Sequence, residues 1–171
     1  MPKYDCLLEG AKRFPELDPS ATEAFLHLLR TGNEIANVFN ALHASHHISQ
    51  GRFMVLMLLH HDPERPARPA DLAVRASVTR ATMTGLIDTL ERDGFVRREP
   101  VADDRRMMQV RLTKAGRAFL ERILPGHFRR IAAVMRRLTE AERRTLVTLL
   151  EKIQQSVPAI RAGAPAKVAV A

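Results

Sequence analysis

Hydrophobic residues recur at helical spacing along the first third of the chain. From Ala21 to about His47, apolar side chains return every three or four positions, which predicts a long helix that Ser20 caps and Gly32 weakens. Residues 1–19 contain three prolines and no sustained period. We therefore expect an irregular N-terminal arm there, with at most one short helical turn.

Two further long helices are predicted near the C-terminus. Thr113 caps an amphipathic stretch that Pro125 is expected to bend or interrupt. A last helix is expected from Thr139 to about Ser156, because Glu142 lies three residues after Thr139 and completes a capping box. The alanine- and proline-rich residues 157–171 are expected to form a mobile tail.

Shorter helices are predicted between these long ones. Ser49 is placed to cap a helix whose run Phe53–Leu59 is apolar on nearly all sides, so this helix is expected to be buried. After a proline-rich turn, Pro69 begins a short helix that ends near Arg75. Residues 76–78 then connect it tightly to a helix that Thr79 caps and that runs to Arg92.

The period of the sequence changes after Asp93 and Gly94, which stop the preceding helix. Residues 95–99 and 107–112 are short and rich in β-compatible side chains, with a polar turn at 102–106 between them, so they predict a hairpin. A short helix, a tight turn, a capped helix and a hairpin in this order are typical of a winged helix-turn-helix. The predicted fold class is mainly α with a small β-hairpin wing.

The helix expected at residues 80–92 has two different faces. Its core-facing side holds Met83, Leu86, Ile87 and Leu90, and its outer side holds Ala81, Thr84, Gly85, Asp88 and Arg92, with Thr82 on a flank. Small outer residues would let the backbone approach the floor of a DNA major groove, where Arg80 and the threonines reach bases or phosphates. An ordinary amphipathic surface helix has the same pattern, and the adjacent hairpin favours DNA binding.

The predicted hairpin is strongly basic. Between Phe95 and Arg117 the chain carries seven cations and three acids: Arg97, Arg98, Arg105, Arg106, Arg111, Lys114 and Arg117 against Glu99, Asp103 and Asp104. A guanidinium at a hairpin tip can enter a narrow minor groove, where the negative potential is enhanced. The alternative is a solvated charge run at a turn. The basic hairpin follows directly after the helix expected at residues 80–92, which is the candidate recognition helix. This position favours DNA contact by the hairpin.

These motifs together resemble the MarR family of bacterial transcriptional regulators. The resemblance is carried by Asp71-Leu72-Ala73, by the stretch Thr79–Val96, by Asp104-Arg105-Arg106 and by Leu112-Thr113-Lys114-Ala115-Gly116. The helix plan around them extends the match from about Ser20 to Ser156. The resemblance implies a winged helix-turn-helix with long N- and C-terminal dimerisation helices at residues 20–48 and 113–156 and a DNA-binding lobe at residues 50–112.

The resemblance also implies partners and site residues. A homodimer is expected to bind double-stranded DNA at a pseudo-palindromic operator, with Arg106 paired to Asp104 and one or both of Arg105 and Arg106 in the minor groove. An effector pocket, in this family often for phenolic or other aromatic acids, is expected between the dimer-forming helices and the lobe. Its candidate residues are His43, His47, Phe53 and Met57. The candidate DNA contacts are Ser77, Thr79, Arg80, Ala81, Thr82, Thr84, Gly85, Arg97, Asp104, Arg105 and Arg106.

Composition narrows the class of protein. The chain has 171 residues and a formal charge of +8, which favours a polyanionic partner, either nucleic acid or an anionic membrane surface. Most of the cations are arginines, whose planar forks suit phosphate and guanine. The sequence lacks a glycine-rich phosphate loop, a Ser/His/Asp pattern and a metal-ligand motif, so we expect neither an enzyme nor a cofactor. Without a signal peptide or a long apolar run, a cytoplasmic protein is expected and no membrane partner.

Histidines and a lone cysteine leave other sensing roles open. His43, His46 and His47 share one helical turn, and His60 and His61 close the next helix, so a metal-sensing site is conceivable, although clustered histidines more often cap helix ends or face water. Cys6 is the single cysteine and could act as a redox switch, although its position alone does not make it a sensor. The leading prediction is a repressor that a small molecule releases. Its alternatives are a constitutive or architectural DNA-binding protein, a Cys6 redox regulator and a winged-helix lobe for protein contacts.

Overall fold

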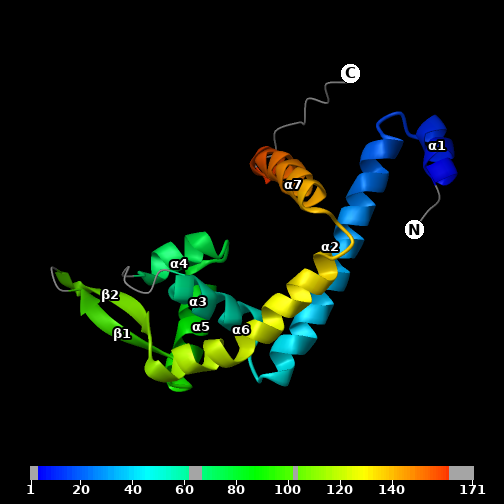
Figure 1. Cartoon of the computed structure of the whole chain (residues 1–171). Coiled ribbons are helices and arrows are strands. Elements are labelled where there is room, and N and C mark those ends of the chain that lie inside the picture. The colour runs from blue at the N-terminus through cyan, green and yellow to red at the C-terminus, as the bar shows by residue number, and fades with distance from the viewer. Residues whose placement is uncertain (1–3, 62–66, 102–103, 162–171) are drawn as a thin grey trace. The chain divides into compact units, whose positions relative to one another are not determined.

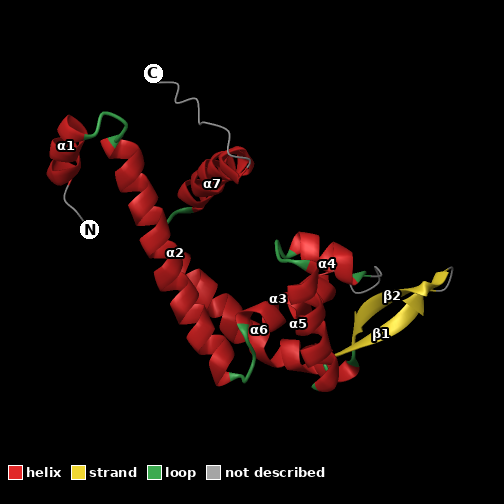
Figure 2. Cartoon of the chain, turned by 180° about the vertical axis from the view of Figure 1, so that it is seen from behind, coloured by secondary structure: helices red, strands yellow, loops and turns green. Residues whose placement is uncertain are grey.

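The computed structural model of the chain describes residues 4–61, 67–101 and 104–161, without the side chains of residues 101, 104–107, 159 and 161. The described residues are mainly helical, with one two-stranded hairpin (Figure 2). The elements are α1 (Tyr4–Arg13), α2 (Pro19–Ser45), α3 (Gln50–His61), α4 (Pro69–Arg75), α5 (Arg80–Arg92), β1 (Val96–Val101), β2 (Asp104–Leu112), α6 (Lys114–Met135) and α7 (Glu140–Arg161) (Figure 1). This order confirms the predicted winged helix-turn-helix.

The chain divides into two compact units, Met1–His127 and Phe128–Ala171, and α6 extends through the division. The hydrophobic core of the first unit joins α3, α4, α5, the hairpin and the first half of α6. Its fully buried side chains are Val55, Leu56, Leu72, Met83, Ile87, Leu90, Val96, Val110 and Leu120. The predicted burial of the apolar run in α3 is confirmed, since Phe53, Val55, Leu56 and Leu59 all lie in this core.

Two predictions about the N-terminal region are wrong. Residues expected to form an irregular arm include the ten-residue helix α1, which is amphipathic and buries Leu7. Helix α2 is capped by Asp18 instead of Ser20, because the Asp18 carboxylate accepts the Ala21 N–H at 3.0 Å and Pro19 occupies the first helical position. The Ser20 hydroxyl donates to that carboxylate instead.

Most helix ends follow the predicted signals. Thr79 and Thr113 cap α5 and α6, and the Ser49 hydroxyl accepts the Arg52 N–H at 3.3 Å at the start of α3. Helix α5 ends in a Schellman motif, with the Phe95 N–H bonded to the Leu90 carbonyl and Gly94 at a φ of +75°. Gly94 supplies the left-handed backbone that turns the chain directly from the helix into β1.

The hairpin is longer than predicted. Strands β1 and β2 pair antiparallel from Val96 opposite Leu112 to Val101 opposite Asp104, with an irregularity after Pro100. The predicted turn at 102–106 is therefore shorter, because β2 already begins at Asp104, and residues 102–103 lie outside the described residues. Strand β2 also forms a hydrogen bond with the segment before α4, since the Val110 N–H donates to the Ala67 carbonyl at 2.9 Å.

The C-terminal helices are more continuous than the prolines suggested. Helix α6 passes through Pro125 without interruption, and both Pro125 and Glu121, whose carbonyl loses its partner there, are solvent-exposed. In the second unit, the predicted capping box at the start of α7 is confirmed, since Thr139 and Glu142 exchange backbone and side-chain hydrogen bonds. Helix α7 extends to Arg161, beyond the predicted end at Ser156, and residues 162–171 lie outside the described part.

Candidate nucleic-acid interface

The N-terminal end of α5 is held in place by its cap. The Thr79 hydroxyl accepts the Thr82 N–H at 3.1 Å, and the hydroxyl oxygens of Thr79 and Thr82 lie 2.8 Å apart. Ser77, just before this cap, has a φ of +53° and ends α4, with the Val78 N–H bonded to the Ala73 carbonyl. These bonds fix the turn between α4 and α5, so the first residues of α5 are presented in one orientation.

The two faces of α5 match the predicted division. Met83, Ile87 and Leu90 are fully buried, and Leu86 packs half-buried against the core. The outward residues Arg80, Ala81, Thr82, Thr84 and Gly85 are all exposed, as are Ser77 and Thr79 before them. The Thr84 hydroxyl donates to the Arg80 carbonyl at 3.0 Å, so its proton is already used and its oxygen is left as an acceptor toward a ligand.

The described base of the hairpin carries a network of charges that the sequence did not reveal. Glu99 pairs with Arg97 of the same strand at 2.6 Å and with Arg111 of the neighbouring strand β2 at 3.1 Å. Arg97, a candidate DNA contact, keeps 62% of its side chain exposed. The side chains of Asp104, Arg105 and Arg106, the other candidates of the wing, lie outside the described residues, so their pairing and their contacts stay predictions.

Arg98 does not belong to the solvent-facing charges of the hairpin, where the sequence grouped it. Its guanidinium contacts Asp88 and Glu91 of α5, each at 2.5 Å. Partial burial lowers the pKa of Arg98, but hydrogen bonds to the two carboxylates outweigh burial and leave the pKa raised. Sequence reasoning missed these contacts, although the seven- and ten-residue separations across a tight helix-to-strand turn make such pairs possible.

Two of the four effector candidates form a buried aromatic cluster. The rings of His43 and Phe53 lie 4.4 Å apart, and Phe39 and His127 pack around them. His43 is 3% exposed, and neither of its ring nitrogens has a hydrogen-bond partner among the described residues. Burial lowers the pKa of His43, and His127 and His46 nearby lower it further. We therefore expect His43 to be neutral at pH 7.

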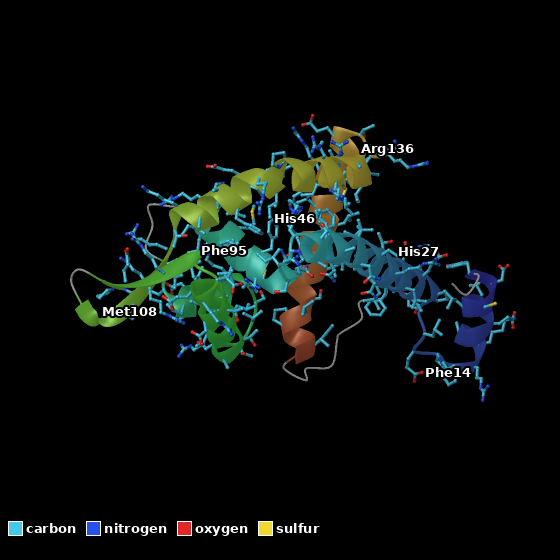
Figure 3. All side chains as sticks on the ribbon, turned by 90° about the horizontal axis from the view of Figure 1, so that it is seen from below. Phe14, His27, His46, Phe95, Met108 and Arg136 are labelled. Carbon is cyan, nitrogen blue, oxygen red and sulfur yellow. The ribbon has the colours of Figure 1, made fainter. Side chains whose placement is uncertain are left out.

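The other two effector candidates are placed differently. Met57 is half-buried against the hydrophobic core. His47 lines a cavity of about 620 Å³ with His46, Asp93, Phe95, Ala115, Ala118, Phe119 and Arg122. Figure 3 marks two of these residues, His46 and Phe95. The Arg122 guanidinium lies 5.5 Å from the centre of the Phe119 ring, and this ring lies 4.7 Å from that of Phe95. The cavity thus combines aromatic walls with a cation.

Two further sensing roles were left open by the sequence, a metal site at the histidines and a redox switch at Cys6. Within the described residues, His, Cys, Asp and Glu side chains form no group of three or more that is placed to hold a metal ion. Cys6 is exposed on α1. None of the described helices is both long enough and apolar enough to cross a membrane.

Comparisons with known proteins agree with this geometry. Residues 48–108 match the model of the MarR family. The chain is 39% identical to the HTH-type transcriptional repressor YetL of Bacillus subtilis (strain 168), over 88% of this chain and 90% of the relative. Several solved structures are similar to this chain, among them those of Sco3205 and BpsR. Sco3205, a MarR family transcriptional regulator from Streptomyces coelicolor solved in complex with DNA, has a TM-score of 0.76 and 24% identity over 82% of this chain and 89% of its own.

The second structure is BpsR from Bordetella bronchiseptica, described with a mechanism for regulation of its DNA binding by 6-hydroxynicotinic acid. It has a TM-score of 0.65 and 26% identity, over 77% of this chain and 98% of its own.

Proposed function

Because this chain belongs to the MarR family of winged helix-turn-helix transcriptional regulators, we propose that it binds operator DNA as a homodimer and represses transcription until a small molecule releases it. The family is one of regulators and not of enzymes. Repression is supported by YetL, a repressor that matches nine-tenths of its own length to this chain. Such a protein acts where the DNA lies, in the bacterial cytoplasm.

The observation that carries the proposal is the exposed face of α5. Its side chains Arg80, Thr82 and Thr84 are exposed beside the small Ala81 and Gly85, while the opposite face is anchored in the core. A helix with a small, polar outer face fits a major groove, where side chains reach base edges. We assign base contacts to the α5 side chains and phosphate or minor-groove contacts to Arg97, Arg105 and Arg106, with Asp104 orienting Arg106.

Dimerisation is supported by apolar side chains that the single chain leaves exposed. Phe25, Leu28, Leu29 and Val38 are exposed on α2, and Val147, Leu149, Ile153, Val157 and Ile160 on α7. Monomeric soluble proteins rarely expose so many large apolar residues on single helices. We propose that residues 20–48 and 113–156 pair with a second copy, which brings two DNA-binding lobes to two half-sites of a pseudo-palindromic operator.

For the effector we propose an aromatic or phenolic acid. The cavity beside the C-terminal end of α5 has a suitable volume, aromatic walls and the Arg122 cation for a carboxylate. BpsR, whose DNA binding 6-hydroxynicotinic acid regulates, supports this ligand class. Because Asp93 and Phe95 line the cavity and lie between α5 and β1, an occupant would contact the segment that joins the recognition helix to the wing.

Binding-site selection on random and genomic duplexes tests the DNA-binding function. We expect one preferred pseudo-palindrome, protected in two halves. Thr84→Ala should change the preferred bases. Arg106→Ala should weaken binding to all sequences and lower the slope of log Kd against log salt by about 0.9 for each phosphate that the variant no longer binds. Lys12→Ala, on the exposed side of α1, serves as the control and should bind as the unmodified protein does. Steep salt dependence without a preferred site would support an architectural protein instead, and no binding at low salt would support a protein-contact lobe.

Titration of benzoic, hydroxybenzoic and hydroxynicotinic acids into the DNA complex tests the effector. We expect at least one acid to release the DNA, and Arg122→Met to weaken that acid's effect without changing affinity for free operator. Release that is identical in the variant would remove the ligand from this cavity. Release by oxidant, abolished in Cys6→Ser, would favour the redox alternative.

A further inference from the structure

Arg98 joins the recognition helix to the wing by three bonds. Its Nη1 donates to Glu91 Oε2 and its Nη2 to Asp88 Oδ1, each at 2.5 Å, and its backbone N–H donates to Glu91 Oε1 at 2.9 Å. Both oxygens of Glu91 are therefore used, one by the backbone and one by the side chain of the same residue. The planar fork of arginine allows one side chain to hold two carboxylates one helical turn apart, which a lysine ammonium cannot do in the same geometry.

Strand alternation explains why Arg98 makes these contacts and its neighbour does not. Successive side chains of a strand point to opposite faces, so Arg97 and Arg98 leave β1 on different sides. Arg97 is 62% exposed, whereas Arg98 is 25% exposed and turns toward α5. The two adjacent arginines thus have the same chemistry and different surroundings, which makes Arg97 a matched control for Arg98.

We propose that Arg98 is a positioning residue for operator binding: it fixes the orientation of the wing relative to α5, so that both reach neighbouring grooves of one duplex in a single register. This inference rests on the proposed DNA-binding function. The α5 backbone is anchored by its buried face, but the described strands β1 and β2 form a two-stranded ribbon, which is marginally stable without further packing. Holding the base of this ribbon against α5 before DNA arrives removes an ordering cost from the binding step.

The exposure of the charges predicts a particular signature. Asp88 is 54% exposed and Glu91 36%, so these pairs are screened by solvent and contribute little to the stability of the fold. Arg98 is committed to α5 and, in this proposal, contacts no phosphate. Its removal should therefore lower operator affinity much more than thermal stability, and it should act on the wing contacts first.

The test compares Arg98→Met with Arg97→Met on the operator found by binding-site selection. Methionine removes the guanidinium and retains an unbranched side-chain stem. We expect Arg98→Met to weaken binding about tenfold, while Tm changes by at most about 4 °C. In chemical footprints, protection of guanine N7 in the major groove should remain at saturating protein, while minor-groove protection at the wing should disappear. Arg97→Met should keep both footprints and lower the slope of log Kd against log salt by about 0.9 for each phosphate that it no longer binds.

A neutral triple variant separates positioning from charge masking. In Arg98→Met combined with Asp88→Asn and Glu91→Gln, neither of these two carboxylates is left to repel phosphates. We expect affinity and the minor-groove footprint to stay reduced, because the fork that holds the wing is missing. Full recovery would show that Arg98 merely neutralises two acids and would overturn the proposal.

Three other results are also decisive. An unchanged Kd and footprint in Arg98→Met would refute the role of Arg98 and leave the DNA-binding function intact. Failure of the unmodified protein to bind any selected duplex would refute the proposed function itself. Parallel disappearance of both footprints together with a large fall in Tm would assign Arg98 to the fold and overturn the positioning role.

Discussion

Gly116 lies in the first turn of α6, where the helix crosses directly over the chain leaving α5. A Cβ added there would lie 2.2 Å from the Phe95 carbonyl oxygen and 3.2 Å from a methyl group of Leu112. The Phe95 oxygen cannot easily move aside, because it accepts the Thr113 N–H at 3.0 Å and lies 3.2 Å from the Thr113 hydroxyl. Gly116→Ala must therefore displace backbone between α5 and β1.

The size of the effect follows from two opposed contributions. Alanine favours a helix over glycine by about 0.5–1 kcal/mol, but forcing a methyl group into a packed site costs about 1–3 kcal/mol and more where the backbone must shift. The Phe95 contact is shorter than real Cβ atoms tolerate, so the second contribution dominates. We expect a net destabilisation of about 1–3 kcal/mol, which for a chain of this size lowers Tm by roughly 2–12 °C.

Differential scanning calorimetry at a fixed protein concentration measures this destabilisation. Gly85→Ala is the matched control, since the same methyl group at Gly85 of α5 meets nothing within 4 Å and should raise Tm slightly. In a DNA-binding assay, Gly85→Ala should bind more weakly than the unmodified protein, because the added methyl group lies on the face proposed to approach the groove floor. The reasoning about Gly116 is refuted if Gly116→Ala melts at or above the temperature of the unmodified protein.

Three further predictions concern buried and capping groups. Because the folded-state pKa of His43 lies below its ordinary value of 6.5, the folded state takes up fewer protons than the unfolded state. The contribution of His43 to the free energy of unfolding should therefore be complete above pH 6.5 and fall as the pH drops below it. The urea midpoints at pH 7.5 and 5.5 should differ less in His43→Leu than in the unmodified protein, and an equal difference would exclude His43 as the cause. Leu120→Ala removes a fully buried side chain of α6 and should cost about 2–5 kcal/mol in denaturant unfolding, whereas a cost below about 1 kcal/mol would contradict its core position. Thr139→Ala removes the cap of α7 and should cost about 1 kcal/mol, while Thr139→Ser should melt as the unmodified chain does.

Local patterns in the sequence were sufficient for most elements and for the faces of α5. Thr79, Thr113 and Thr139 each cap a helix as predicted, and Gly94 ends α5. Such signals act within a few residues, through a side chain bonding a nearby backbone group or a backbone angle that glycine adopts freely. The spacing that buries Met83, Ile87 and Leu90 is local in the same sense, because the helical period alone decides which residues share a face.

Other features depended on parts of the chain that meet only after folding. Helix α1 was missed because prolines stand near both of its ends and only one of its ten residues, Leu7, is buried. His43 could be interpreted as a helix-end histidine until α3 and α6 placed Phe53 and His127 around it. Arg98 looked like any other cation of a basic hairpin.

One chain thus divides into what neighbours along the sequence decide and what neighbours in space decide. Where helices start and stop, and which side of each is apolar, was written in spacing and in capping residues. Which charges are free for a ligand and which are already paired was decided by packing, because an arginine's partner is whichever carboxylate the fold brings within reach of its fork. Arg97 and Arg98 are adjacent and chemically identical. The pleat of β1 and the position of α5 leave Arg97 exposed and pair Arg98 with two carboxylates of α5.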